Sequence, residues 1–244
     1  MSATQTYPPD AKVLIVDDDR AMRDGLSNLF RSVALQVHTF STPTELIAFE
    51  CSPSPTCLVL DVRLPGQSGL ALHQTIVGSA PEMPVVFISG YADTPTAVSA
   101  LKAGAIDFLD KPFQELDLLS AVGRGLQLSH ERLEHTAIMS ILTRSFEKLT
   151  HREREIMALL STGLRNKHIG MRLGLSEVTV KMHRANVMRK LEIESLVDLV
   201  RIADALGMHH WDQVHDSHSP SVSCRPNEGL RLLTASKRRS AAPR

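Results

Sequence analysis

The chain has 244 residues, which is long for one average compact domain, so two domains are expected. Hydrophobic residues make up 43% and charged residues 22%, a composition that excludes disorder over the whole chain. No apolar run approaches the roughly 18 residues of a bilayer span, and the first residues do not resemble a secretory signal, so we expect no membrane partner. The cysteines number 3 and lack metal-ligand spacing, which favours reduced thiols and a cytoplasmic location.

The net charge of zero conceals opposite charges on the two parts of the chain. Residues 1–125 contain 8 basic and 14 acidic residues, a net charge of −6, whereas the remainder contains 19 basic and 13 acidic residues, a net charge of +6. A basic second part favours an anionic partner, although the charge alone does not name the anion.

Short apolar runs rich in β-branched residues predict strands at 12–16, 57–60, 85–88 and 106–109, and a weaker run at 36–40 brings the number of predicted strands to five. Helical periodicity separates them; Met22, Leu26 and Leu29, for example, share one helix face. This alternation predicts an α/β doubly wound five-stranded parallel sheet with right-handed crossovers. Ligands of such sheets bind at the carboxyl ends of the strands.

Polar residues follow the ends of four of these strands, namely Asp17, Asp18, Asp61, Ser89 and Lys111. They should converge on one edge of the sheet, where three carboxylates would repel one another unless a cation neutralised them. An all-oxygen cluster prefers a hard ion such as Mg²⁺. A cation beside an aspartate, with a hydroxyl and an ammonium nearby, suits phosphoryl transfer to the carboxylate.

Two other interpretations of these acids remain. Strand-end acids often cap the following helix, and we favour that role for Asp19. Asp17 and Asp19 also form a D-x-D pattern, as in metal-dependent phosphatases of the haloacid dehalogenase family, but those enzymes place threonine where this chain has Ala21. We therefore do not expect an enzyme, and we assign no catalytic residue.

Residues 10–126 resemble the receiver domain of two-component response regulators, on the motifs VLIVDDD, LVLDVRLPGQSG, FISG and FLDKPF. The resemblance implies a flavodoxin-like fold in which Asp61 accepts phosphate from a sensor histidine kinase. It also implies Mg²⁺ bound by Asp18, Asp61 and the backbone carbonyl of Arg63, with Asp17 holding a metal-bound water.

The same resemblance implies a switch. Lys111 and Ser89 would contact the phosphoryl group, Phe108 would swing inward, and the bond before Pro112 would be cis. Residues 95–125 would then form the face through which the protein forms a homodimer. Ala34 departs from the family, which commonly has glycine in a left-handed turn there; alanine would cost about 1 kcal/mol, unless the turn is built differently.

Residues 127–145 contain charged and apolar residues without glycine or proline and predict a helical linker. Both a dimer stem and a flexible connection are compatible with this pattern.

Helical segments follow the linker. Thr150 and Glu153 form a capping box that predicts a helix start. A short helix at 166–173 is separated from another, beginning at Ser176, by the spacing of a helix-turn-helix, and Gly170 would let the two approach closely.

The third helix of this region has one apolar face, made by Val180, Val187 and Leu191. Lys181, Arg184 and Lys190 are predicted to be available to solvent or to a polyanion, which fits an element of the DNA major groove.

Residues 146–207 resemble the all-α four-helix DNA-binding domain of the NarL/LuxR class, and most closely its FixJ branch, on the segment LTHREREIMALLSTGLRNKHIGMRLGLSEVTVKMHRANVMRKL. The resemblance implies contacts with base edges by Lys181, Met182 and Ala185. It makes Thr179, Arg184 and Asn186 candidates for contacts with bases or phosphates. A matching histidine, His183, is interpreted as packed against the helix pair rather than as a base contact.

The last predicted helix begins at Ser195, with an apolar stripe of Leu196, Leu199, Val200 and Ala203. The stripe fits either a core or the pairing of two DNA-binding domains on inverted half-sites. Residues 208–244 lack periodicity and predict a disordered tail, whose histidines match no closed metal site.

Together these features predict a phosphorylation-dependent DNA-binding transcriptional regulator of a two-component system, with promoter DNA and RNA polymerase as partners. A receiver that serves as an interaction platform and is never phosphorylated is an alternative.

Overall fold

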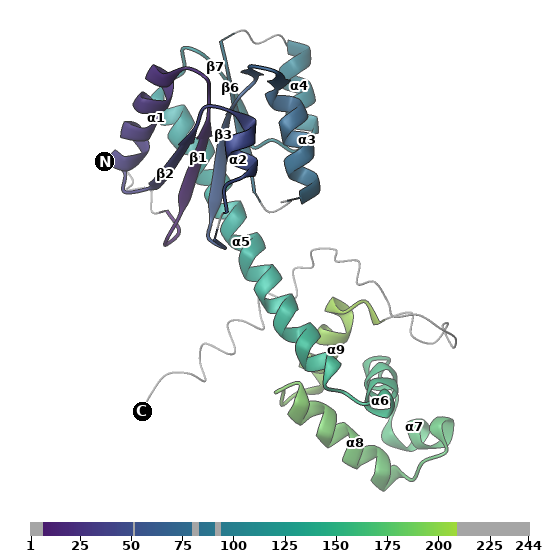
Figure 1. The fold of residues 1–244 in the computed structure, drawn as a ribbon. Coiled ribbons are helices and arrows are strands. Elements are labelled where there is room, and N and C mark those ends of the chain that lie inside the picture. Colours follow the sequence, from purple (N-terminus) through teal and green to yellow (C-terminus); the bar gives the residue numbers. More distant parts are fainter. Residues whose placement is uncertain (1–6, 51, 80–82, 91–93, 209–244) are drawn as a thin grey trace, which may run out of the picture. The chain divides into compact units, whose positions relative to one another are not determined.

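The computed structural model describes residues 7–50, 52–79, 83–90 and 94–208 (Figure 1). The chain forms two compact units, Met1–Glu134 and His135–Arg244, called here the first and the second unit. Apart from Met208, the predicted tail lies outside the described residues.

The first unit contains the five-stranded parallel sheet that the sequence predicts. Its order is β2–β1–β3–β6–β7, and its strands are β1 (Lys12–Val16), β2 (Gln36–Phe40), β3 (Thr56–Asp61), β6 (Val85–Ser89) and β7 (Asp107–Asp110). The paired strands are parallel in every case, with Val16 opposite Leu60 and Ile88 opposite Leu109. Because all strands run in one direction, their carboxyl ends lie at one edge of the sheet.

Helices cover both faces of this sheet, and alternate residues of each strand supply two separate cores (Figure 1). The helices are α1 (Arg20–Ser32), α2 (Pro43–Ile47), α3 (Gly69–Ser79), α4 (Thr94–Lys102) and α5 (Glu115–Glu147). On one face Ile15 and Val59 pack with residues of α1 and α5. On the other, Leu14 and Leu58 pack with residues of α2, α3 and α4.

Two local features of the first unit test expectations for α1. Asp19 is its N-cap, and Asp19 Oδ1 accepts a hydrogen bond of 2.8 Å from the backbone N–H of Ala21, which confirms the capping role. Ala34 adopts the left-handed conformation, with φ of 62°. The turn is therefore built as it would be with glycine, and the alternative of a different turn is wrong.

A short antiparallel hairpin, β4 (Arg63–Leu64) and β5 (Gln67–Ser68), follows β3 and was not predicted from the sequence. Gly66 lies between its strands with φ of 82°. The hairpin leads directly into α3.

The second unit is helical. Helix α5 extends into it without interruption through residues 127–145, so the helical prediction for this stretch is confirmed. The following helices are α6 (His151–Ser161), α7 (Asn166–Leu173), α8 (Glu177–Lys190) and α9 (Leu196–Ala205), which share one hydrophobic core. Both hydrogen bonds of the predicted capping box between Thr150 and Glu153 are present. No helix among the described residues is long and apolar enough to cross a membrane.

Candidate phosphoacceptor site and nucleic-acid interface

Three carboxylates meet at the carboxyl edge of the sheet. Asp17 and Asp18 directly follow β1, and Asp61 ends β3, the strand beside it. One carboxylate oxygen from each lies within 4.8 Å of the others. Asp17 and Asp61 are buried and Asp18 is exposed, so the cluster opens to solvent on the side of Asp18.

Lys111 places an ammonium group against two of these acids. Its Nζ lies 2.7 Å from Asp17 Oδ2 and 3.4 Å from Asp61 Oδ2. The backbone holds it there, because Lys111 N donates a 2.7 Å hydrogen bond to the carbonyl oxygen of Ser89 at the end of β6. The bond between Lys111 and Pro112 is cis.

The electrostatics of the cluster favour bound cations. Burial raises the pKa of Asp61; the charge of Lys111 opposes this rise, and the charge of Asp17 adds to it. Burial alone would lower the pKa of Lys111, but its hydrogen bond and charge interaction with Asp17 outweigh burial and raise that pKa. One ammonium among three carboxylates leaves an excess of negative charge.

The donor set fits a hard divalent cation. All the ligand atoms that the cluster offers are carboxylate oxygens, and they are close enough to share one ion. Magnesium binds in proteins through one or two carboxylates while keeping several waters, and the exposed side at Asp18 leaves room for them.

The helix-turn-helix spacing of the second unit corresponds to a tight turn between α7 and α8. Gly174 ends α7 in the left-handed conformation, with φ of 65°. Gly170 lies against this turn, and a Cβ added to it would lie 2.7 Å from the carbonyl oxygen of Leu175. Gly170 therefore lets the turn that connects the two helices pass close to α7, whereas the predicted close approach of the helices themselves stays a prediction. Ser176 then caps α8 by accepting a 3.1 Å hydrogen bond from the backbone N–H of Thr179.

Comparison with known proteins identifies both units. Residues 13–123 match the response regulator receiver domain, and residues 147–203 match the bacterial regulatory proteins of the luxR family. The chain is a response regulator. It combines a receiver domain with a LuxR-type DNA-binding domain and is a two-component transcriptional regulator.

Relatives of this response regulator match over most of their length. Nodulation protein W of Bradyrhizobium diazoefficiens is 42% identical over 83% of this chain and 90% of its own. Response regulator protein TmoT of Ectopseudomonas mendocina is 41% identical over 81% and 90%, and transcriptional regulatory protein FixJ of Azorhizobium caulinodans is 37% identical over 82% and 95%. The solved structure of the response regulator StyR has 42% sequence identity and a TM-score of 0.73, covering 80% of this chain and 98% of that chain.

The remaining receiver residues singled out from the sequence lie on β6, on β7 and in the hairpin after β3 of this response regulator. Ser89 is fully buried at the end of β6, and the register pairs Ile88, which precedes it, with Asp61. Phe108 is half-buried in β7, and its ring centroid lies 6.3 Å from that of Phe87. Arg63 is exposed in the hairpin, and its backbone N–H donates a 3.3 Å hydrogen bond to Asp61 Oδ1.

Two residues that position the acids were missed in the sequence. Arg23 Nη1 donates a 2.7 Å hydrogen bond to the backbone carbonyl of Asp17. Gly69, at the start of α3, approaches the backbone of Asp61 so closely that a Cβ would overlap with the Asp61 carbonyl oxygen. The only sequence signal for Gly69 is a glycine that ends the turn after the aspartate, which is too common to identify a contact.

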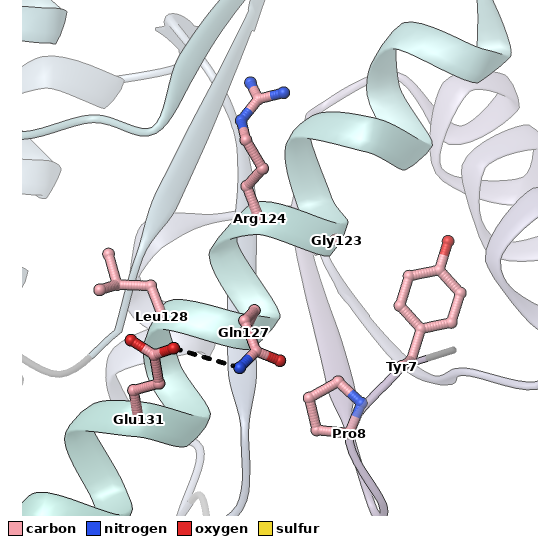
Figure 2. Close-up of a pocket in the computed structure, with 7 residues that line it drawn as sticks. All are labelled: Tyr7, Pro8, Gly123, Arg124, Gln127, Leu128 and Glu131. Carbon is pink, nitrogen blue, oxygen red and sulfur yellow. Dashed lines mark hydrogen bonds between the residues drawn. The ribbon is translucent and has the colours of Figure 1, made fainter. Parts of the chain in front are cut away.

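A groove elsewhere on the receiver contains none of these residues. It has a volume of about 480 Å³ and is lined by Tyr7 and Pro8 and by residues of α5 (Figure 2). Within it, Gln127 Nε2 donates a 3.3 Å hydrogen bond to Glu131 Oε1. The groove offers no cluster of acids and no ammonium, so it is not a second site of the same kind.

The side chains of α8 divide into a buried and an exposed face. Val180, Val187 and Leu191 are buried, as predicted. Of the residues proposed for DNA contact, Lys181, Met182 and Ala185 are exposed, whereas Thr179, Arg184 and Asn186 are partly buried. The hydroxyl oxygen of Thr179 lies 2.8 Å from that of Ser176, so it also contributes to the cap.

One expectation for α8 needs correction. Lys190 was expected to be available to solvent or DNA, but its Nζ lies 2.7 Å from Glu153 Oε2 and donates a 3.1 Å hydrogen bond to the carbonyl of Lys148. Its ammonium therefore binds groups within the domain and is not available to DNA. The imidazole of His183 is partly buried, and its Nδ1 is buried without a hydrogen-bond partner among the described residues, which agrees with packing against the helix pair.

Helix α9 serves the core and also presents an apolar surface. Leu199 and Ala203 are buried in the shared core, while Val197 and Val200 are exposed. The core role is therefore confirmed for Leu199 and Ala203, and the pairing of two DNA-binding domains stays a prediction.

Proposed function

We propose that Asp61 accepts a phosphoryl group from the phosphohistidine of a sensor kinase, and that this modification controls DNA binding by the second unit. The observation that carries the proposal is the convergence of Asp17, Asp18 and Asp61 beside Lys111 at one edge of the sheet. Acids and an ammonium whose pKa values are shifted by burial and by one another, at a partly open edge, are typical of functional sites.

In this proposal Mg²⁺ would be held by Asp18, Asp61 and the backbone carbonyl of Arg63, with Asp17 holding a water beside it. When bound, the ion neutralises the charge that develops on the phosphoryl oxygens. The burial of Asp61 beside Asp17 is consistent with a site that needs such neutralisation.

The transfer needs little covalent chemistry from the protein. A carboxylate oxygen of Asp61 forms the new bond to phosphorus, the bond from phosphorus to the histidine nitrogen breaks, and that nitrogen keeps the electron pair. The ammonium of Lys111 lies beside Asp61, where it can form an ion pair with a phosphoryl oxygen. The Ser89 hydroxyl supplies a hydrogen-bond donor to the phosphoryl group. Positioning and charge neutralisation therefore supply most of the rate.

Phosphorylation adds about −1.5 to −2 charges at this edge. We propose that Ser89 and Phe108 respond by moving toward the phosphoryl group, which changes the face at 95–125 and favours a homodimer. Two DNA-binding domains would then engage inverted half-sites of promoter DNA, with the exposed valines of α9 available for their pairing and RNA polymerase as the downstream partner. This function would place the protein in the cytoplasm.

The proposal divides the chain as the sequence predicts: residues 10–126 receive the phosphoryl group, residues 127–145 connect, and residues 146–207 bind DNA through Thr179, Lys181, Met182, Arg184, Ala185 and Asn186.

The test is phosphorylation by a small donor. The full chain is incubated with acetyl phosphate and Mg²⁺, and intact mass is measured. Wild type should gain one phosphoryl group, Asp61→Asn should gain none, and Asp24→Asn, which removes an exposed acid of α1, should behave as wild type. Equal labelling of wild type and Asp61→Asn would overturn the assignment of Asp61. No labelling of wild type would favour a receiver that serves only as an interaction platform.

A further inference from the structure

The exposed face of α8 carries apolar side chains that the core does not use. Val178 is 76% exposed and Met182 is 54% exposed. Neither belongs to the hydrophobic core of the second unit, as far as the structure describes it. Val178 was not among the residues expected to contact DNA.

These two residues lie one helical turn apart on the same face, because a separation of four residues brings side chains together on a helix. Ala185, also exposed, extends this face toward the end of α8. The Cα atoms of Val178 and Met182 are about 6 Å apart along the helix axis, at 1.5 Å per residue. This spacing is close to two base-pair steps of about 3.4 Å each.

The charge around this face indicates what covers it. Residues 166–189 contain 5 Lys and Arg residues and 1 acidic residue, a net charge of +4. Lys181 lies between Val178 and Met182 in the sequence and is exposed, and Arg189 is exposed further along the helix. An apolar strip bordered by cations fits the major groove, where phosphates lie at the margins and base edges on the floor.

The only apolar group that base pairs present in the major groove is the C5-methyl group of thymine. Valine and methionine side chains have no N–H or O–H donor for the other base edges. We infer that Val178 and Met182 read thymine methyl groups, so that each half-site of the operator contains thymines opposite these two side chains. This inference rests on the proposed function of α8 as the DNA-reading helix.

Thymine-methyl recognition has a specific chemical test. Full-length protein, treated with acetyl phosphate and Mg²⁺, is first used to select binding sites from a randomised double-stranded DNA library. Each thymine of the recovered site is then replaced by deoxyuridine, which removes only the methyl group and keeps the base pair. Burial of one methyl group corresponds to about a four-fold change in affinity.

We expect deoxyuridine at two defined positions of a half-site to weaken wild-type binding by about four-fold each. Met182→Ala should lose the sensitivity at one of these positions and Val178→Ala at the other. Met171→Ala is the matched control, since Met171 is also an exposed methionine, on α7, and it should keep both sensitivities. Thermal denaturation should show that all three variants remain folded, because the substituted side chains are exposed.

The outcomes separate this inference from the proposed function. A selected site at which deoxyuridine has no effect at any position would overturn the inference and leave sequence-specific DNA binding in place. Retention of both sensitivities by Met182→Ala and Val178→Ala would overturn it as well. Failure to select any sequence would refute the proposed function itself.

Discussion

Substitution of Glu153 by glutamine should destabilise the DNA-binding domain, because this carboxylate connects the start of α6 with the end of α8. Glu153 Oε2 accepts hydrogen bonds from Lys190 Nζ at 2.7 Å and from the backbone N–H of Thr150 at 2.8 Å. Lys190 ends α8 and Thr150 caps α6, so one carboxylate holds the two helices together. Glutamine can still accept the bond from Thr150, but it brings no charge for Lys190.

The magnitude follows from how far each partner is buried. Removing one partner of a buried ion pair costs about 3–5 kcal/mol, because the other charge stays behind without compensation. The side chain of Glu153 is 5% exposed, but that of Lys190 is 24% exposed and keeps its hydrogen bond to the carbonyl of Lys148. The ammonium therefore retains some solvation, and we expect Glu153→Gln to lower the free energy of unfolding by about 2 kcal/mol.

The effect should depend on pH. Burial alone would raise the pKa of Glu153, but its hydrogen bonds with Lys190 and Thr150 and the charge of Lys190 outweigh burial and lower that pKa below its ordinary value of 4.5. A lowered folded-state pKa means that the carboxylate stabilises the domain fully above the unfolded-state pKa. This stabilisation is lost as the pH falls through the folded-state pKa. The stability difference between wild type and variant should thus be constant near neutral pH and shrink below about pH 4.5.

Hydrogen exchange measured by mass spectrometry in the full chain reports this stability locally. A loss of 2 kcal/mol corresponds to about 30-fold faster exchange in peptides from α6 and α8 at neutral pH, while peptides from β1 and β3 serve as an internal control. Thermal denaturation at pH 7 and pH 4 tests the pH dependence. Unchanged protection of α6 would show that the pair is no stronger than a solvent-exposed one and would refute this reasoning.

Three further substitutions test other contacts. Gly69→Ala should slow phosphorylation by acetyl phosphate by about 10- to 100-fold, because its Cβ would displace the backbone of the aspartate that ends β3. Intact mass measures the phosphorylation, and Gly25→Ala is the control because Gly25 lies in open space on α1. Glu177→Gln should raise the affinity of the protein for random DNA by about two- to five-fold at low salt, because it removes the carboxylate 3.1 Å from Lys181 Nζ. A fluorescence anisotropy titration measures this affinity, and no change would mean that Lys181 does not approach DNA. Ala34→Gly should stabilise the receiver by about 1 kcal/mol, because glycine adopts the left-handed conformation without the steric strain of alanine. The melting temperature should rise, and a fall would show that Ala34 is not strained.

Much of the receiver could be predicted from sequence because its three central strands, β1, β3 and β6, are buried on both faces. A strand such as β3 is then a continuous apolar run, and the residue at which the run stops marks the edge of the sheet. For this reason Asp17 and Asp61, 44 positions apart in the numbering, could be assigned to one cluster from the sequence alone. The hairpin after β3 could not be predicted, because strands of two residues have no periodicity to detect.

The contact of Gly69 with the Asp61 backbone could not be predicted from the sequence for a different reason. Its cause is the path of the chain between β3 and α3, which depends on that hairpin. A glycine after a turn has many explanations, and only the three-dimensional path distinguishes them.

Periodicity also explains what was right and wrong about α8. It assigns each residue to a face of the helix, and the buried positions Val180 and Val187 follow directly. It does not identify partners from elsewhere in the chain. Lys190 lies at the border of the exposed face, and its long side chain reaches a carboxylate 37 residues away, which no local pattern indicates.

The two lysines of α8 show that the burial of the glutamate paired with a lysine decides whether that lysine is available to DNA. Lys181 and Lys190 each have Nζ within 3.1 Å of a glutamate oxygen, so distance does not distinguish them. The partner of Lys181 is Glu177, whose side chain is 47% exposed, and such a pair contributes about 0–1 kcal/mol, so Lys181 can exchange it for a base or phosphate at little cost. Lys190 cannot leave Glu153 without leaving a buried carboxylate that has no compensating charge. Lys181 is therefore suited to bind DNA, and Lys190 to hold the domain that presents it.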